Sequence, residues 1–236
     1  MQGISMQGIL FRVSGRWAHF KKPDTNNTPL THDFITKTAM LGLMGAVLGI
    51  ERREMRELFP RWSESFLYGV RLENKVRKES WSFTLRYLSG GQSPKPLEFL
   101  RDPDFTVALA AQTDDAQNAL QNFARFLEEE RAHFTPILGL HNCPAALKLQ
   151  QRGEWQRASG AYSTQGFALR SQKLKPSMEE LSSLRVGFER IPTFQNNDFW
   201  NLPDRYEEVV YPDAGGTISL EGEHFRFSDG SNWSLV

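Results

Sequence analysis

The chain has 236 residues, of which 39% are hydrophobic and 24% are charged, and its formal net charge is zero. This is enough apolar material for one globular domain with an elaboration, and the neutral balance argues against a general polyanion binder. The sequence contains no stretch of about 18 apolar residues, so no membrane span is expected. A single cysteine, Cys143, excludes an internal disulfide and a cysteine-based zinc site. Because no secretory signal is evident, we expect a cytoplasmic protein.

The charges are divided unevenly along the chain. Residues 1–101 carry 16 Lys and Arg against 9 Asp and Glu, a balance of +7, whereas the remaining residues carry 12 against 19, a balance of −7. One interpretation is a basic face that holds an anion, with an acidic part that faces elsewhere. The alternative is chance clustering of solvated charges.

The first predicted element is a buried strand over residues 8–13, which ends at the turn signal Ser14-Gly15. Residues 16–35 then mix aromatic, histidine and lysine side chains, which predicts an ordered but irregular loop. Such a loop either packs on the body of the protein or meets a ligand. Its candidate ligand contacts are His19, Lys21 and Lys22.

Residues 37–53 are predicted to form a helix that is buried on more than one face, with Thr36 or Thr38 as its N-cap. Gly42, Gly45 and Gly49 lie on one side of it. Because each interior glycine costs about 1 kcal/mol relative to alanine, their clustering indicates close approach of another backbone. Two partners fit, namely a packed element of the same chain or an RNA backbone near the helix start, where free N–H groups favour phosphate.

A second strand is predicted over residues 65–73, and residues 74–98 are predicted to be a protruding insertion. Aromatic residues alternate with polar ones from Trp81 to Tyr87, which indicates an amphipathic strand followed by a Gly- and Pro-containing loop. The insertion has the residue types that bind single-stranded RNA, cations for phosphates and aromatic rings for bases. The alternative is a hairpin with a buried aromatic face and merely solvated charges. The candidate contacts are Lys75, Arg77, Lys78, Trp81 and Arg86.

The next predicted elements are a strand at 105–111, a helix at 113–130 and a strand near 145–150. With the insertion removed, the order is strand, helix, strand, strand, helix, strand. This is the α+β, ferredoxin-like (RRM-like) βαββαβ order found in many RNA-binding domains. We therefore predict a domain over 1–150 and a β-rich extension over 151–236, the latter with a hairpin at 151–170, a mobile polar loop at 171–184 and short strands near the end.

Motifs for other chemistries are missing. The histidines have no metal-ligand spacing, and the sequence contains no phosphate-binding loop, dinucleotide-binding glycine motif or serine nucleophile elbow. We expect no cofactor, no metal and no catalytic residue. One enzymatic alternative stays open, because His19 beside Lys21 and Lys22 has the residue types of a metal-independent ribonuclease.

Four segments resemble the Cas five family of the RAMP superfamily in sequence, order and spacing. They are SGRWAHF at 14–20, TKTAMLGLMGAVLGIER at 36–52, LRDPDFTVALA at 100–110 and FTPILGLHNCPA at 134–145. The resemblance covers about residues 7–150, and the glycine-studded helix followed by TPxLG is its most specific part. The C-terminal region matches only loosely.

The resemblance implies a subunit of a type I CRISPR Cascade complex that caps the 5′ handle of the CRISPR RNA (crRNA). It implies a ferredoxin-like domain with a β-hairpin thumb, here residues 74–98, that displaces a guide base. It implies contacts with the Cascade backbone subunit and large subunit, and with target DNA only through the complex. The implied handle-facing residues are His19, Thr36 and Lys37.

One branch of that family cleaves precursor crRNA, and this chain resembles the non-cleaving branch. A tyrosine–lysine–histidine set is not evident where the cleaving branch carries it, since Tyr68 precedes Gly69 rather than a basic pair. Precursor processing remains the alternative function.

Overall fold

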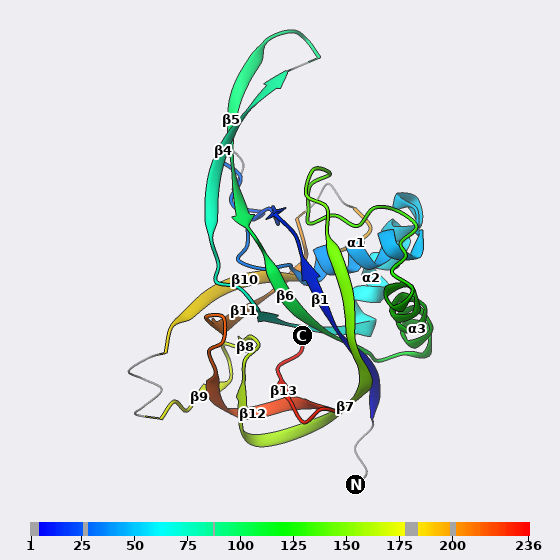
Figure 1. The fold of residues 1–236 in the computed structure, drawn as a ribbon, viewed down its shortest axis with the longest axis vertical. Coiled ribbons are helices and arrows are strands. Elements are labelled where there is room, and N and C mark those ends of the chain that lie inside the picture. Colours follow the sequence, from blue (N-terminus) through cyan, green and yellow to red (C-terminus); the bar gives the residue numbers. More distant parts are fainter. Residues whose placement is uncertain (1–4, 26–27, 87, 178–183, 199–201) are drawn as a thin grey trace.

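The computed structural model describes residues 5–25, 28–86, 88–177, 184–198 and 202–236. The chain is mostly sheet, with helices gathered on one side and a hairpin that projects from the opposite end to the N-terminus (Figure 1). The predicted mixture of helix and sheet is confirmed. Among the described residues, no helix is long and apolar enough to cross a membrane.

The central sheet is antiparallel and has the strand order β13-β12-β7-β1-β6-β3, with β9 added beside β12. Its middle consists of the predicted strands in the order β7-β1-β6-β3. The bounds are β1 Met6–Ser14, β3 Phe66–Leu72, β6 Asp104–Ala111, β7 Ala146–Thr164, β9 Lys173–Leu174, β12 Ile218–Phe227 and β13 Asn232–Trp233.

Strand β6 is buried along its whole length because both faces of the sheet are covered. Val107 and Leu109 point to the helices, and Ala108 and Ala110 point to the C-terminal segment. Successive side chains of a strand alternate between faces, so a run of apolar residues such as this marks burial on both sides.

Three helices cover one face: α1 Lys37–Leu48, α2 Arg52–Ser65 and α3 Asp114–Glu128. The predicted helix over 37–53 is too long, because Gly49 adopts a left-handed conformation (φ 78°) and ends α1. The chain then reverses into α2, which the sequence did not predict. Its polar sequence contains Pro60, and it folds as a helix with a capping box between Glu51 and Glu54.

The predicted insertion contains a two-stranded hairpin, β4 Lys78–Arg86 and β5 Gln92–Arg101, joined at its base to β2 Trp17–Ala18. The strand β5 includes Pro94 and Pro96, which the sequence placed in a loop. The two prolines are two residues apart, so both nitrogens turn to the same edge of the hairpin. Proline is tolerated at such an edge because no neighbouring strand needs its N–H.

The hairpin predicted over 151–170 is wrong. Strand β7 continues through residue 150 to Thr164 and pairs with β1 along its first half and with β12 along its second half. Gly153 and Gly160 resemble turn residues in sequence. In the structure Gly153 leaves room for the ring of Phe227, and Gly160 pairs with Gly222.

A separate three-stranded sheet has the order β10-β11-β8, with bounds β8 Ala168–Leu169, β10 Val186–Phe194 and β11 Arg205–Pro212. We call β10 and β11 the C-terminal ribbon. It packs on the helical side of the core through Ile191, Val209 and Tyr211. Two of the short strands predicted near the C-terminus form the single strand β12. Residues 178–183 of the predicted mobile loop lie outside the described residues.

Candidate nucleic-acid interface

A groove of about 790 Å³ lies beside the start of α1, below the hairpin. Its walls come from the 19–29 loop, one side of α1 from its start to Ala46, β5, the 135–140 loop and the end of β10, with Phe59 of α2 and Pro203. Of the predicted contact residues, His19, Lys21 and Thr36 line it. The lining also includes residues that the sequence did not single out as contacts, notably Lys95, Thr135, Gly139 and Gln195.

Three of the four segments that carry the family resemblance, those at 14–20, 36–52 and 134–145, meet at this groove. The backbone N–H of His19 donates to the carbonyl of Leu138 at 3.0 Å, and those of His133 and Phe134 donate to the last turns of α1, each at 3.0 Å. Gly139 has φ 89°, and a Cβ there would lie 1.9 Å from the carbonyl oxygen of His19. The glycine of the TPxLG segment is therefore required by close backbone approach.

The helix start borders the groove through Thr36 and Thr38. Thr36 is the N-cap predicted as one of two alternatives, and its side chain accepts from the backbone N–H of Ala39 at 3.3 Å. No acidic residue occupies the first turn of α1. Free N–H groups and the helix dipole therefore favour an anion here.

The charge in the groove is positive. Its charged lining residues are Lys21 and Lys95, and among the residues that the structure describes no Asp or Glu lines it. His19 is buried, and its Nδ1 lies 2.6 Å from the carbonyl oxygen of Glu98, so Nδ1 carries the hydrogen. Burial lowers the His19 pKa, which favours the neutral ring.

The three glycines have partners within the chain. A Cβ on Gly45 would lie 2.4 Å from Sδ of Met55, and one on Gly42 would lie 3.7 Å from the ring of Phe59, both on α2. Gly49 is the C-cap of α1. Close packing against α2 thus accounts for Gly45, and the left-handed cap conformation accounts for Gly49. Gly42, where a Cβ would meet α2 at an ordinary contact distance, also lines the groove.

Two predicted contact residues are held in close ion pairs, and a third, Lys75, lies 4.0 Å from Asp213. Lys22 lies 2.8 Å from Glu189 of β10, and Lys78 lies 2.6 Å from Asp33 and donates to the carbonyl of Thr31 at 2.9 Å. Burial lowers the Lys78 pKa, but the hydrogen bond and charge of Asp33 outweigh it and the pKa is raised. Lys78 therefore fastens the root of the hairpin to the 19–33 loop.

The ion pairs belong to a polar network that joins the C-terminal ribbon to the groove. Glu189 accepts from Lys22, from Nδ1 of His32 at 3.0 Å and from the N–H of Asp33 at 3.2 Å. Burial raises the Glu189 pKa, but the hydrogen bonds from His32 and Lys22 outweigh it and lower the pKa to about 2. Tyr211 of β11 donates to the carboxylate of Asp33. The ribbon thus orders the loop that forms one wall.

Lys37 is only 4% exposed and does not line the groove. Burial lowers its pKa to about 8, and the charge of Glu64 offsets part of that effect. Its side chain is therefore covered, and its predicted contact with phosphate stays a prediction.

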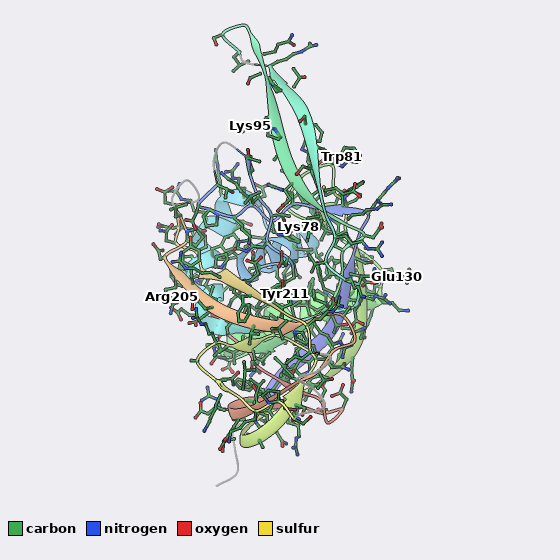
Figure 2. All side chains as sticks on the ribbon, turned by 90° about the vertical axis from the view of Figure 1, so that its left-hand side faces the viewer. Lys78, Trp81, Lys95, Glu130, Arg205 and Tyr211 are labelled. Atoms are coloured by element: carbon green, nitrogen blue, oxygen red, sulfur yellow. The ribbon has the colours of Figure 1, made fainter. Side chains whose placement is uncertain are left out.

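Of the remaining predicted residues, Trp81 and Arg86 lie on β4, and Figure 2 labels Trp81. Trp81 is 47% exposed, and its ring meets that of Trp17 edge-on at 4.9 Å, while the ring of Phe83 lies 5.8 Å from that of Phe99. The aromatic side chains are thus packed at the base of the hairpin, as expected for the alternative of a buried aromatic face. The ring of Trp81 is half exposed. Arg86 is exposed farther along β4. Lys75 and Arg77 border a different hollow, beside Arg101.

The sequence offered little signal for the missed lining residues. Lys95 stands between two prolines and was assigned to a loop, and Gln195 comes from a region with no motif. Only Thr135 and Gly139 belonged to a motif segment already singled out.

The geometry defines a mixed α/β protein with a cationic groove at a helix start and a protruding hairpin beside it. The family model described as CRISPR-associated protein (Cas_Cas5) matches residues 8–210. The chain belongs to this family.

Known relatives agree with this assignment. The chain is 29% identical over 152 residues to the CRISPR system Cascade subunit CasD of Escherichia coli K12, a match that covers 58% of this chain and 66% of that protein, just under two thirds of its length. Two solved structures share the fold. One is a CRISPR protein from Archaeoglobus fulgidus (TM-score 0.60, 12% identity, 98% and 99% of the two chains). The other belongs to a CRISPR RNA-guided surveillance complex (TM-score 0.53, 13% identity, 91% of each chain).

Proposed function

We propose that this chain is a non-catalytic subunit of a type I CRISPR surveillance complex, and that it binds the 5′ handle of the crRNA. The observation that carries the proposal is the groove at the start of α1. It combines the N-terminal turn of a helix, two lysines and no carboxylate among its described lining residues. An RNA phosphodiester backbone fits this combination, because helix N-termini and lysines both favour phosphate. Family membership and the Cascade relative support the biological setting.

The proposal assigns roles to the surrounding elements. The strand order β7-β1-β6-β3, with α1 and α3 on one face, supports a ferredoxin-like body, and the β4–β5 hairpin is the proposed thumb. His19, Lys21, Thr36 and Lys95 are the proposed handle contacts. Lys37 does not line the groove, and its contact with the handle stays a prediction from the sequence. A backbone subunit and a large subunit are the proposed protein partners.

The direct test is the salt dependence of handle-RNA binding. Each phosphate contact to single-stranded RNA contributes about 0.7 to the slope of log affinity against log salt. We expect the double variant Lys21→Ala/Lys95→Ala to weaken binding and to reduce that slope by roughly 1.4, measured for the reconstituted complex in a potassium chloride series.

The matched control is Lys173→Ala. Lys173 is exposed on β9, at the far end of the sheet from the hairpin (Figure 1), so its loss should leave both affinity and slope unchanged. Equal slopes for wild type and the double variant would refute the groove as the binding site.

The non-catalytic part of the proposal rests on the environment of Tyr68 and His19. Tyr68 is fully buried and donates its hydroxyl to the carbonyl of Ile35, and burial raises its pKa well above the usual value. We therefore expect no cleavage when the chain is incubated with labelled repeat RNA in EDTA. A discrete cut that disappears in His19→Ala would overturn this part and favour precursor processing.

A further inference from the structure

A second cavity adjoins the groove. It has a volume of about 330 Å³ and lies between the 22–24 segment and the C-terminal ribbon, and we call it the ribbon pocket. Pro23 lines both the groove and the ribbon pocket. An RNA strand that follows the groove past Pro23 therefore reaches the mouth of this pocket. Its volume is within the range of about 300–1,000 Å³ that is usual for ligand sites.

The wall of the ribbon pocket presents flat side chains. Phe188 of β10 is 64% exposed although it borders a cavity, so a large apolar surface is left open to water. Next to it, the guanidinium carbon of Arg190 lies 4.2 Å from the ring centroid of Tyr206. Unpaired bases stack on aromatic rings and on arginine planes, and both surfaces are available here.

The floor holds a buried polar atom without a partner. His32 is 2% exposed, and its Nδ1 is occupied by Glu189, but its Nε2 has no hydrogen-bond partner. Among the side chains that the structure describes, it is the one buried nitrogen or oxygen atom that lacks a hydrogen-bond partner. A buried polar group without a partner is unfavourable, and the residue that carries it, His32, lines the ribbon pocket.

The charges in the pocket favour a base over a phosphate. Lys22 is paired with Glu189 at 2.8 Å, and Arg170 is paired with Glu208 at 2.6 Å. Asp24 also lines the cavity. Carboxylates repel a phosphate, and the pairing leaves little net positive charge to attract one. A neutral, planar group with hydrogen-bonding edges meets no such repulsion.

We infer that the ribbon pocket receives one unpaired base of the RNA strand held in the groove, stacked on Phe188 and facing His32. The inference rests on the proposed RNA-binding function and extends it, because it adds a base-recognising site to a backbone-recognising groove. Phosphate contacts position a strand, whereas base contacts in a pocket distinguish one nucleotide from another.

The test is position-resolved photocrosslinking in the complex reconstituted with guide RNA. Thio-substituted bases (4-thiouridine or 6-thioguanosine) are placed at one handle position at a time, and the crosslinked peptides are identified by mass spectrometry. We expect a single position to crosslink to β10 at or beside Phe188. Its yield should fall at least fivefold in Phe188→Ala and persist in Phe188→Tyr, which keeps the ring.

Two controls separate the possible failures. Leu174→Ala removes another exposed apolar side chain, 43% exposed on β9, and should change nothing. Because Phe188 is largely exposed, Phe188→Ala should fold normally, which its thermal unfolding verifies. Crosslinks to the groove residues 19–25 or 92–101 without any to β10 would overturn the base pocket alone. Absence of crosslinks to either region would overturn the proposed function itself.

Discussion

In this protein, burial decides the hydrogen-bond partners and the charge of single residues. His19 and His32 are both buried histidines, yet one donates to a backbone carbonyl and borders the groove, whereas the other is bound to a buried carboxylate. Lys37 is the clearest case. It begins α1 next to the groove, but its side chain turns into the protein, where its charged form is poorly solvated. The position of Lys37 in the sequence did not reveal that its side chain points into the protein.

The buried charge of Lys37 predicts a pH-dependent cost. Its folded pKa of about 8 lies below the usual lysine value of 10.5, so folding disfavours the protonated form. Below pH 8 the penalty is complete, on the order of 3 kcal/mol, and it disappears as pH rises from 8 to 10.5. We expect Lys37→Met to be more stable than wild type at pH 7, with a difference that shrinks over that window.

Urea unfolding of both proteins at pH 7, 9 and 10 measures the effect. A stability difference that stays constant with pH would show that the Lys37 charge is not the cause.

Among the elements, the hairpin is fastened at its root and free beyond it. Lys78 ties β4 to the 19–33 loop, and the rings of Trp81 and Phe83 meet Trp17 and Phe99. Beyond these contacts the hairpin extends away from the body (Figure 1). An element anchored in this way can act on a bound strand without contributing much to the stability of the fold.

A shortened hairpin tests this separation. Phe83 and Lys95 are paired across β4 and β5, so residues 84–94 can be replaced by Asn-Gly, which forms a two-residue turn between paired positions. We expect the unfolding free energy to change by about 1 kcal/mol or less, because the removed part has few buried contacts. In the reconstituted complex, chemical probing should show altered pairing of guide bases near the handle. A large loss of stability would favour the alternative that the hairpin belongs to the core.

At the scale of the whole molecule, the C-terminal segment completes the fold. Trp233 lies on the second face of the central sheet, 2% exposed, with its ring against Gly69 and Gly166. It also meets Trp155 edge-on at 6.3 Å. The C-terminal part therefore seals the face of β6 that the helices leave open, while the ribbon orders one wall of the groove. The predicted domain over 1–150 and the predicted extension over 151–236 therefore share one hydrophobic core.

Replacing Trp233 measures this contribution. Trp233→Ala should lower the free energy of unfolding by about 3–5 kcal/mol, the usual cost of removing a buried tryptophan. Trp81→Ala, which removes the same side chain from a half-exposed site, should cost about 1 kcal/mol or less. Guanidinium unfolding of the two variants gives the comparison. Similar losses in both would mean that the C-terminal segment is not an integral part of the core.

The sequence by itself determined the features that depend on neighbours along the chain. The alternation of β4, the apolar run of β6, the cap at Thr36 and the chain order of β1, α1, β3, β6, α3 and β7 follow from local periodicity and local hydrogen bonding. The four motif segments were sufficient to predict the family.

Tertiary structure decided what those residues contact. The glycines of α1 pack on a helix that was not predicted, since α2 owes its stability to packing rather than to a strong apolar pattern. The groove collects side chains from segments far apart in the sequence. Whether a lysine lines it, as Lys21 does, or is covered in the protein, as Lys37 is, depends on which segments fold beside that lysine. Side-chain direction and burial arise from these non-local contacts, which sequence spacing does not encode.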